Sequence, residues 1–262
     1  MTDPAGDARA EPVVETAGLT KQFGELTAVD SVDLRVERGE FRSVIGPNGA
    51  GKTTLFNCIT GAMAPTSGTV RFDGEDVTDL PPHERVSRGL GRSFQITNIF
   101  GGLTVRENVR LAAQSVLDEG MSLREEMLRD KDTFGRINDR TSGVLEQVGL
   151  DGRAGELAET LAYGDQRRLE IGIVLATDPE LVMLDEPTAG MSSEETRATI
   201  DLIEDVLADR TLMLIEHDID LVMELSDRVT VLTRGEVLAT GNPAEIAANE
   251  DVREAYLGGV RA

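Results

Sequence analysis

Cysteine and histidine are nearly absent from this chain of 262 residues. Cys58 is the only cysteine, which excludes an internal disulfide and any metal site built from several cysteines, and which fits a reducing cytoplasm. The two histidines, His83 and His217, lie far apart in the sequence, so a dedicated zinc site is not expected. These counts speak against both a disulfide scaffold and a zinc protein.

Long apolar segments are absent as well. No run approaches the roughly 18 apolar residues that mark a membrane-spanning helix. Residues 1–12 are polar and acidic and lack the apolar stretch of a signal peptide, so we expect a short disordered leader there. The length suits one or two compact units with a sizeable core. We therefore expect a soluble intracellular protein.

Basic residues are few, and lysine is almost missing. The chain has 48 acidic and 26 basic residues, a net charge of −22, and its lysines are Lys21, Lys52 and Lys131. Such a charge disfavours nonspecific binding to nucleic acid or anionic lipid, so we expect no nucleic-acid partner. The acids are spread along the chain, and their excess over lysine resembles proteins of extreme halophiles. The alternative, an acidic tail or an acidic binding patch, would require the acidic residues to be clustered.

A glycine-rich stretch organises the chain. It reads Gly46-Pro47-Asn48-Gly49-Ala50-Gly51-Lys52-Thr53-Thr54 and fits the pattern G-x-x-x-x-G-K-[ST]. Apolar residues at 41, 44 and 45 predict a buried strand before it, and residues 52–59 predict a helix that Gly61 ends. A glycine turn that spells the pattern by chance is the alternative. The strand, loop and helix context favours nucleotide binding.

The chemistry of phosphate binding explains this spacing. Glycines let successive backbone N–H groups curl around a phosphate, and the N-terminus of the following helix adds a favourable partial charge. Lys52 would reach the β- and γ-phosphates, and the Thr53 hydroxyl would hold Mg²⁺. A nucleoside triphosphate with Mg²⁺ is therefore the expected ligand.

Two carboxylates, Asp185 and Glu186, follow an all-apolar strand predicted over residues 181–184. Ionised carboxylates at the end of a buried strand are costly unless a cation or a water molecule uses them. Asp185 suits Mg²⁺, and Glu186 suits an attacking water that must be oriented or deprotonated. Alone this pattern is weak, but downstream of a phosphate loop it predicts the second half of a nucleotide site.

The rest of the chain predicts an α/β fold. Helices are expected over 165–177, 193–208 and 219–225, strands over 181–184 and 211–215, and a hairpin from 228–232 and 236–239. Apolar strands that alternate with helices indicate a parallel sheet covered on both faces.

Upstream, strands are expected over 13–20, 29–36 and 90–95, a hairpin with an Asp-Gly turn over 68–77, and a short helix that begins at Pro81-Pro82 and runs to about 88. Residues 104–164, with segments at 123–129 and 144–148, predict a helical insertion.

The motifs together resemble the ATP-binding subunits of ABC transporters. Five features carry the resemblance in order: the phosphate loop, Gln95, Leu161-Ala162-Tyr163-Gly164-Asp165, Asp185-Glu186 and His217. Within that family the chain is similar to the high-affinity branched-chain amino-acid uptake ATPases. The closest matches are residues 91–95, residues 161–164, Ile215-Glu216-His217-Asp218 and residues 253–258.

The resemblance implies a P-loop NTPase (RecA-like) parallel-sheet core with an N-terminal antiparallel β subdomain and an inserted helical subdomain. The ATP-binding domain would cover residues 13–257, with the helical subdomain at about 101–168 and a tail at 258–262. The implied partners are a second related ATPase, two membrane permeases and an extracytoplasmic solute-binding protein. ATP hydrolysis at the cytoplasmic face of the membrane would power import, with Mg²⁺ as cofactor.

The resemblance also implies roles for single residues. Phe23, expected in a loop, would stack on adenine, although a core Phe is equally compatible with its spacing. Gln95 would sense Mg²⁺ and water and couple to the membrane subunits, and His217 would contact the γ-phosphate in its own site. Residues 161–165, the signature segment, would bind the γ-phosphate held by the opposite subunit. Residues 189–192 would cross the dimer seam.

Some residues depart from the family pattern. The usual signature is Leu-Ser-Gly-Gly-Gln, whereas this chain has Ala162, Tyr163 and Asp165 at three of those positions. The missing hydroxyl at Ala162 leaves the Gly164 backbone N–H as a phosphate donor, and Ser192 replaces the usual Asp at the seam. The two ATP sites of a dimer are therefore expected to differ, which favours a heterodimer.

The sequence leaves the solute open, with branched-chain amino acids ahead of urea, short amides and other small solutes. The segment 95–103 is the candidate for docking a permease, with Ile96, Ile99, Phe100 and Leu103 as its apolar residues; a core role is equally compatible. A non-transport ABC ATPase is disfavoured by the single short unit and the negative charge, and a P-loop kinase or GTPase by the signature and His217.

Overall fold

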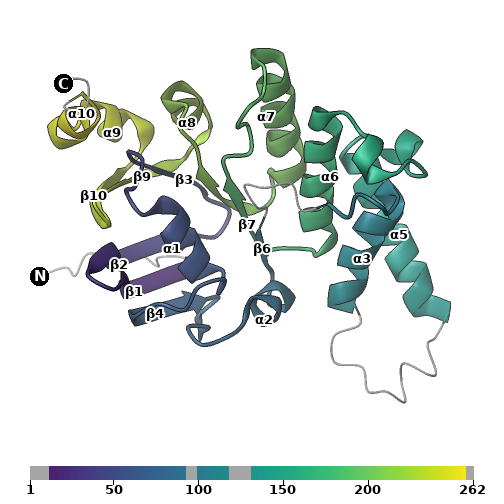
Figure 1. Ribbon diagram of the computed structural model, residues 1–262, viewed down its shortest axis with the longest axis horizontal. Coiled ribbons are helices and arrows are strands. Elements are labelled where there is room, and N and C mark those ends of the chain that lie inside the picture. The colour runs from purple at the N-terminus through teal and green to yellow at the C-terminus, as the bar shows by residue number, and fades with distance from the viewer. Residues whose placement is uncertain (1–11, 93–98, 118–130, 258–262) are drawn as a thin grey trace, which may run out of the picture.

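The computed structural model describes residues 12–92, 99–117 and 131–257. It contains a six-stranded sheet and a four-stranded sheet (Figure 1). A group of helices lies on the side of the six-stranded sheet that faces away from the four-stranded one. In the described part of the chain, no helix is both long and apolar enough to cross a membrane.

The larger sheet is parallel apart from one edge. Its strands are β10 (Glu236–Gly241), β9 (Arg228–Thr233), β3 (Phe41–Ile45), β8 (Thr211–Ile215), β7 (Leu181–Asp185) and β6 (Leu90–Arg92), in that spatial order. The β10–β9 pair is the predicted hairpin and is antiparallel. The strand predicted over 90–95 is confirmed as far as Arg92, and residues 93–95 lie outside the described residues.

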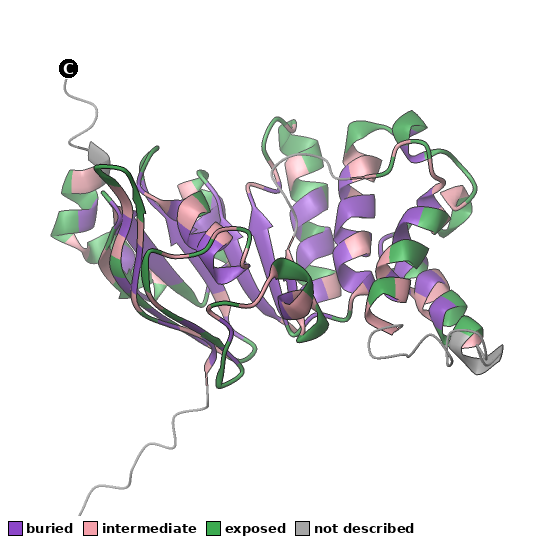
Figure 2. Cartoon of the chain, turned by 60° about the horizontal axis from the view of Figure 1, so that its bottom comes forward, coloured by how far each residue is buried: buried purple, intermediate pink, exposed green. Residues whose placement is uncertain are grey.

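Both faces of this sheet are covered, as the apolar runs predict. In β7, Leu181 and Met183 pack in the cluster that includes Phe56 of the first helix, whereas Val182 and Leu184 pack with residues of the helical group. The central strands β7 and β8 are accordingly buried along their whole length (Figure 2). This burial fixes the register of the strands, and therefore the positions of the loops at their ends.

The smaller sheet is antiparallel, in the order β2 (Leu26–Glu37), β1 (Pro12–Phe23), β4 (Ser67–Phe72) and β5 (Glu75–Asp76). Its first two strands are longer than predicted, so Phe23 is the last residue of β1 and not part of a loop. The Asp-Gly turn of the hairpin is confirmed, because Asp73 and Gly74 both have left-handed backbone angles, with φ of 49° and 77°.

Nine α-helices are described in these residue ranges. They are α1 (Lys52–Ile59), α2 (Pro82–Ser87), α3 (Val105–Leu117), α5 (Lys131–Gln147), α6 (Tyr163–Ala176), α7 (Ser193–Leu207), α8 (Ile219–Leu225), α9 (Pro243–Ala248) and α10 (Glu250–Leu257). The helix predicted over 123–129 lies outside the described residues. Helix α6 begins two residues before the predicted start, so part of the signature segment is helical.

Helices α3, α5 and α6 share one core, to which Val109, Leu145 and Leu169 contribute. Helix α1 carries Cys58, which is completely buried, and burial raises the pKa of its thiol. Helices α9 and α10 were not predicted, although α9 begins with a capping box in which Asn242 and Glu245 bond each other's backbone N–H groups.

Candidate nucleotide-binding site

The site lies where neighbouring parallel strands end. In the larger sheet β3, β8 and β7 are adjacent, and Ile215 at the end of β8 pairs with Val44 of β3 and with Asp185 of β7. The phosphate loop follows β3, Glu186 follows β7, and His217 follows β8 by two residues. The carboxyl ends of parallel strands are where α/β proteins bind ligands.

Two glycines of the phosphate loop are required by close backbone contacts. A Cβ atom at Gly46 would lie 2.2 Å from the carbonyl oxygen of Leu232, and one at Gly51 would lie 2.2 Å from that of Ala28. Gly51 also has a φ of 103°, which side-chain-bearing residues rarely adopt. No side chain caps the N-terminus of α1 and its first turn has no acidic residue, so its N–H groups can serve an anion.

The Lys52 side chain folds back over the loop. Its Nζ donates hydrogen bonds to the carbonyl oxygens of Gly46, at 2.7 Å, and Pro47, at 3.3 Å. Lys52 is buried, which lowers the pKa of its ammonium group, while the charges of Glu186 and Asp185 oppose that shift. A polyphosphate in the loop would supply the opposite charge that this buried ammonium lacks.

A pocket of about 360 Å³ opens above the loop. It is lined by Phe23, Leu26, Ala28, Asn48, Gly49, Ala50, Gly51, Lys52, Thr53, Thr54, Glu186 and His217. Phe23 is 46% exposed, so the core alternative is wrong for this residue. The ammonium of Lys21 lies 5.3 Å from the centre of its ring. An exposed ring at the edge of a phosphate site is suited to stacking against a nucleobase.

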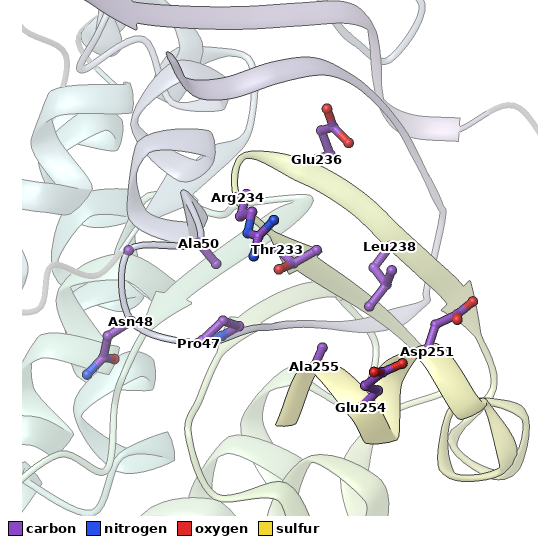
Figure 3. Close-up of a pocket in the computed structure, with 11 residues that line it drawn as sticks. Pro47, Asn48, Ala50, Thr233, Arg234, Glu236, Leu238, Asp251, Glu254 and Ala255 are labelled. Carbon is purple, nitrogen blue, oxygen red and sulfur yellow. The ribbon is translucent and has the colours of Figure 1, made fainter. Parts of the chain in front are cut away.

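A larger pocket, of about 890 Å³, lies on the other side of the loop, between residues 47–50, the β9–β10 hairpin and α10 (Figure 3). Its charged lining consists of Glu236, Asp251 and Glu254 against Arg234. Three carboxylates facing one guanidinium disfavour a polyphosphate. The smaller pocket, which contains Lys52, is therefore the candidate nucleotide site, although it has the smaller volume.

Asp185 is the buried carboxylate of the site. Its Oδ2 lies 3.3 Å from Nη2 of Arg92 at the end of β6, and its Oδ1 accepts no hydrogen bond from the described residues. Burial raises the pKa of Asp185, and the charge of Arg92 opposes that shift. A buried carboxylate oxygen in need of a partner fits the hard oxygen ligands that Mg²⁺ prefers. Thr53 lines the pocket above the loop, whereas Asp185 lies behind that lining.

Arg92 has no role in the sequence analysis, although it stands inside the family match at residues 91–95. Its Nη1 donates to Oδ1 of Asn57, at 2.6 Å, and to Oγ1 of Thr60, at 3.1 Å, both on or next to α1. Burial lowers the pKa of its guanidinium, and Asp185 opposes the shift. Arg92 thus ties the carboxylate strand β7 to the helix of the phosphate loop.

Glu186 and His217 form a pair at the edge of the pocket. Glu186 Oε1 lies 2.6 Å from His217 Nε2, within hydrogen-bond distance. The backbone of Glu186 is left-handed, with a φ of 50°, and its N–H donates to the carbonyl oxygen of Ile215 at 2.9 Å. Arg167 of α6 donates to the carbonyl oxygens of Glu186, at 3.0 Å, and Pro187, at 2.9 Å. The surrounding structure therefore holds a backbone conformation that is unfavourable by itself.

Comparisons with known proteins show the family of this chain. The ABC transporter family model matches residues 29–189. The chain is 42% identical over 255 residues to BraF, a high-affinity branched-chain amino acid transport ATP-binding protein of Pseudomonas aeruginosa, with 95% of this chain and 99% of BraF covered. The chain belongs to the ABC transporter ATP-binding family. A second model, of branched-chain amino acid ATP-binding cassette transporters, matches residues 236–262.

Solved ABC ATP-binding cassettes have the same fold. An ATP-binding cassette of an ABC transporter in its ADP conformation has a TM-score of 0.79 to this chain and is 29% identical, with 94% of this chain and 99% of that one covered. A dimeric cassette in a post-hydrolysis state, bound to ADP and Pi, has a TM-score of 0.72 and 28% identity, with 88% and 98% covered. The predicted α/β P-loop fold with its antiparallel sheet and helical segments is confirmed.

The ABC signature segment lies apart from the phosphate loop in this chain. Leu161 is buried and Ala162 precedes α6, whose first turn contains Tyr163, Gly164 and Asp165. None of these residues lines the pocket that contains Lys52. Gln95, the other expected Mg²⁺ contact, lies outside the described residues.

The unusual signature residues have partners within the chain. The Tyr163 hydroxyl donates to the carbonyl oxygen of Ala189, at 2.9 Å, in the seam segment. The Asp165 carboxylate is ion-paired with Arg153, which also binds Glu156. The negative charge that replaces the usual Gln therefore faces a guanidinium that it shares with Glu156.

Proposed function

We propose that this protein hydrolyses ATP to power an ABC importer, and that the imported solutes are branched-chain amino acids. The observation that carries the hydrolysis proposal is the Glu186–His217 pair at 2.6 Å, beside the phosphate loop. The solute proposal rests on the family match over residues 236–262 and on the similarity to BraF.

We infer separate roles for residues of the pocket and for Asp185 and Gln95. Lys52 and the loop N–H groups bind the β- and γ-phosphates, and Phe23 stacks on the adenine. Thr53, Asp185 and Gln95 would hold Mg²⁺, which would supply positive charge against the phosphate oxygens. Glu186 accepts a proton from the attacking water as general base, and His217 orients the Glu186 carboxylate and contacts the γ-phosphate.

The dimeric assembly that we propose follows from the position of the signature segment, residues 161–165, outside the pocket that contains Lys52. The signature segment of one subunit completes the ATP site of another, so two ATP-binding subunits close face to face over their nucleotides. We propose that the second subunit is a related ATPase, since Ala162, Asp165 and Ser192 depart from the usual pattern. Two permeases, against which the subunits lie at the cytoplasmic face of the membrane, and an extracytoplasmic binding protein complete the importer.

Two variants separate ATP binding from hydrolysis. Glu186→Gln keeps the size of the side chain but removes the base, so ATP binds while phosphate release falls by about 100-fold or more. Lys52→Ala removes the positive charge, so ATP binding itself weakens. Both are measured in the complex purified with its membrane subunits, by equilibrium ATP binding and by phosphate release. Near wild-type hydrolysis by Glu186→Gln would show that Glu186 is not the base.

Uptake by cells tests the solute. Cells whose sole copy carries Glu186→Gln are expected to lose energised uptake of labelled leucine, isoleucine and valine, while urea uptake stays unchanged. Loss of urea uptake with unchanged leucine uptake would contradict the proposed solute without touching the ATPase assignment.

A further inference from the structure

Glu216 is a buried carboxylate that connects the loop of Glu186 with the loop of His217. It stands between the end of β8 and His217, and only 5% of its surface is exposed. Its Oε1 accepts hydrogen bonds from the Thr188 hydroxyl, at 2.6 Å, and from the Thr188 N–H, at 3.1 Å. Its Oε2 accepts from the N–H of His217, at 3.1 Å. Both carboxylate oxygens are therefore used.

These bonds connect two loops that come from different strands. Thr188 lies two residues after Glu186 on the loop that leaves β7, and His217 lies on the loop that leaves β8. The side chains of Glu186 and His217 form a second link between the same two loops. Within the described ranges no Lys, Arg or His side chain is ion-paired with Glu216, so neutral donors hold its charge.

Burial of the Glu216 carboxylate is costly in free energy unless all of these hydrogen bonds are made. A buried carboxylate without a cation is tolerated when its oxygens accept several hydrogen bonds, and removal of one donor leaves a charged oxygen unsatisfied. The loop that Glu216 holds is the one in which Glu186 has its left-handed backbone. When the tether is lost, this loop can relax toward an ordinary conformation and carry the Glu186 carboxylate away from His217.

We propose that Glu216 is a positioning residue for ATP hydrolysis, one that sets the distance between Glu186 and His217 by bridging Thr188 and the His217 backbone. This inference rests on the proposed ATPase function. Glu216 is absent from the lining of the nucleotide pocket, so it acts through its neighbours and not on the substrate. A displacement of about 1 Å at a reacting group can cost about 100-fold in rate.

The test compares variants at both ends of the bridge in the purified complex. Glu216→Gln replaces one acceptor oxygen by a donor amide, which faces an N–H group. We expect kcat to fall by about 10- to 100-fold while the Kd for ATP stays within about threefold, since the phosphate loop is untouched. Thr188→Val, which removes the hydroxyl alone, should lower kcat in the same direction, and Thr188→Ser, which keeps it, should hydrolyse ATP like wild type.

Glu40→Gln is the matched control for burial. Glu40 is 7% exposed and ion-paired with Arg42, near the opposite end of β3, so its loss affects stability without reaching the pocket. Comparison of the thermal unfolding of Glu216→Gln with that of Glu40→Gln separates a general loss of stability from misplacement of the Glu186 side chain.

Two results would overturn the positioning role, and two others would overturn the proposed ATPase function on which it rests. Glu216→Gln with kcat within about twofold of wild type would refute the positioning role. Equal losses in kcat and ATP affinity, with Thr188→Ser as impaired as Thr188→Val, would show a purely structural role. If the wild-type complex released no phosphate, or if Glu186→Gln hydrolysed ATP like wild type, the proposed function would fail first.

Discussion

Replacing Arg92 by Leu should expose the cost of the buried Asp185 charge. The side chains of Arg92 and Asp185 are 8% and 1% exposed, and their closest charged atoms lie 3.3 Å apart. Breaking a buried pair by removing one partner costs about 3–5 kcal/mol of unfolding free energy, because the remaining charge is left uncompensated. For a chain of this size, that loss lowers Tm by about 6–20 °C.

The loss should depend on pH in a defined direction. Burial already raises the pKa of Asp185, and Arg92 opposes that shift, so the Arg92→Leu variant has an Asp185 with a still higher folded-state pKa. Stability from the protonated carboxyl is fully present below the unfolded pKa of about 3.9, and it is lost as the pH rises through the folded pKa. The deficit of the variant relative to wild type is therefore largest near neutral pH and shrinks on acidification.

Denaturant unfolding from about pH 8 to about pH 5 measures this dependence. The control is the double variant Arg92→Leu/Asp185→Asn, in which both charges are gone and most of the lost stability should return. A deficit that stays constant over that pH range, or a double variant no more stable than Arg92→Leu, would refute the reasoning. Mg²⁺ should stabilise Arg92→Leu more than the double variant, since Asp185 keeps its charge but has lost the guanidinium that paired with it.

Two further predictions concern the whole chain. A net charge of −22 repels itself unless it is screened, so thermal stability should rise steeply between roughly 0.1 and 2 M KCl; a Tm that is flat or falls over this range would contradict a halophilic origin. Light scattering of the purified Glu186→Gln variant with ATP should give mostly monomers, because a heterodimer needs the second ATPase; a stable homodimer would speak against that arrangement.

The parts of the site that sequence predicted are those with local patterns. The phosphate loop and Asp185-Glu186 each follow an apolar strand, and the residues that define them are contiguous. Helix α9 had a readable start at Asn242, Pro243 and Glu245, which the sequence analysis did not use. The start of α9 is therefore encoded locally in the sequence.

Other contacts could not be predicted, because they join residues that are distant in the chain. Arg92 meets Asp185 only because β6 and β7 are neighbours in the sheet. Glu216 meets Thr188 only because β8 lies beside β7. Phe23 lies in a strand and not a loop because pairing with Leu26 extends β1 to its end, a tertiary effect that outweighs local propensity.

The buried thiol of Cys58 gives the unmodified chain a chemical reporter. The thiolate is the reactive form, and both burial and the raised pKa keep Cys58 inert while α1 stays packed. Alkylating reagents therefore label those molecules in which the helix behind the phosphate loop has opened. A ligand in the loop lowers that population, so the rate of alkylation reads nucleotide occupancy without an introduced probe. Cysteines added at exposed positions could be labelled selectively with Cys58 left in place.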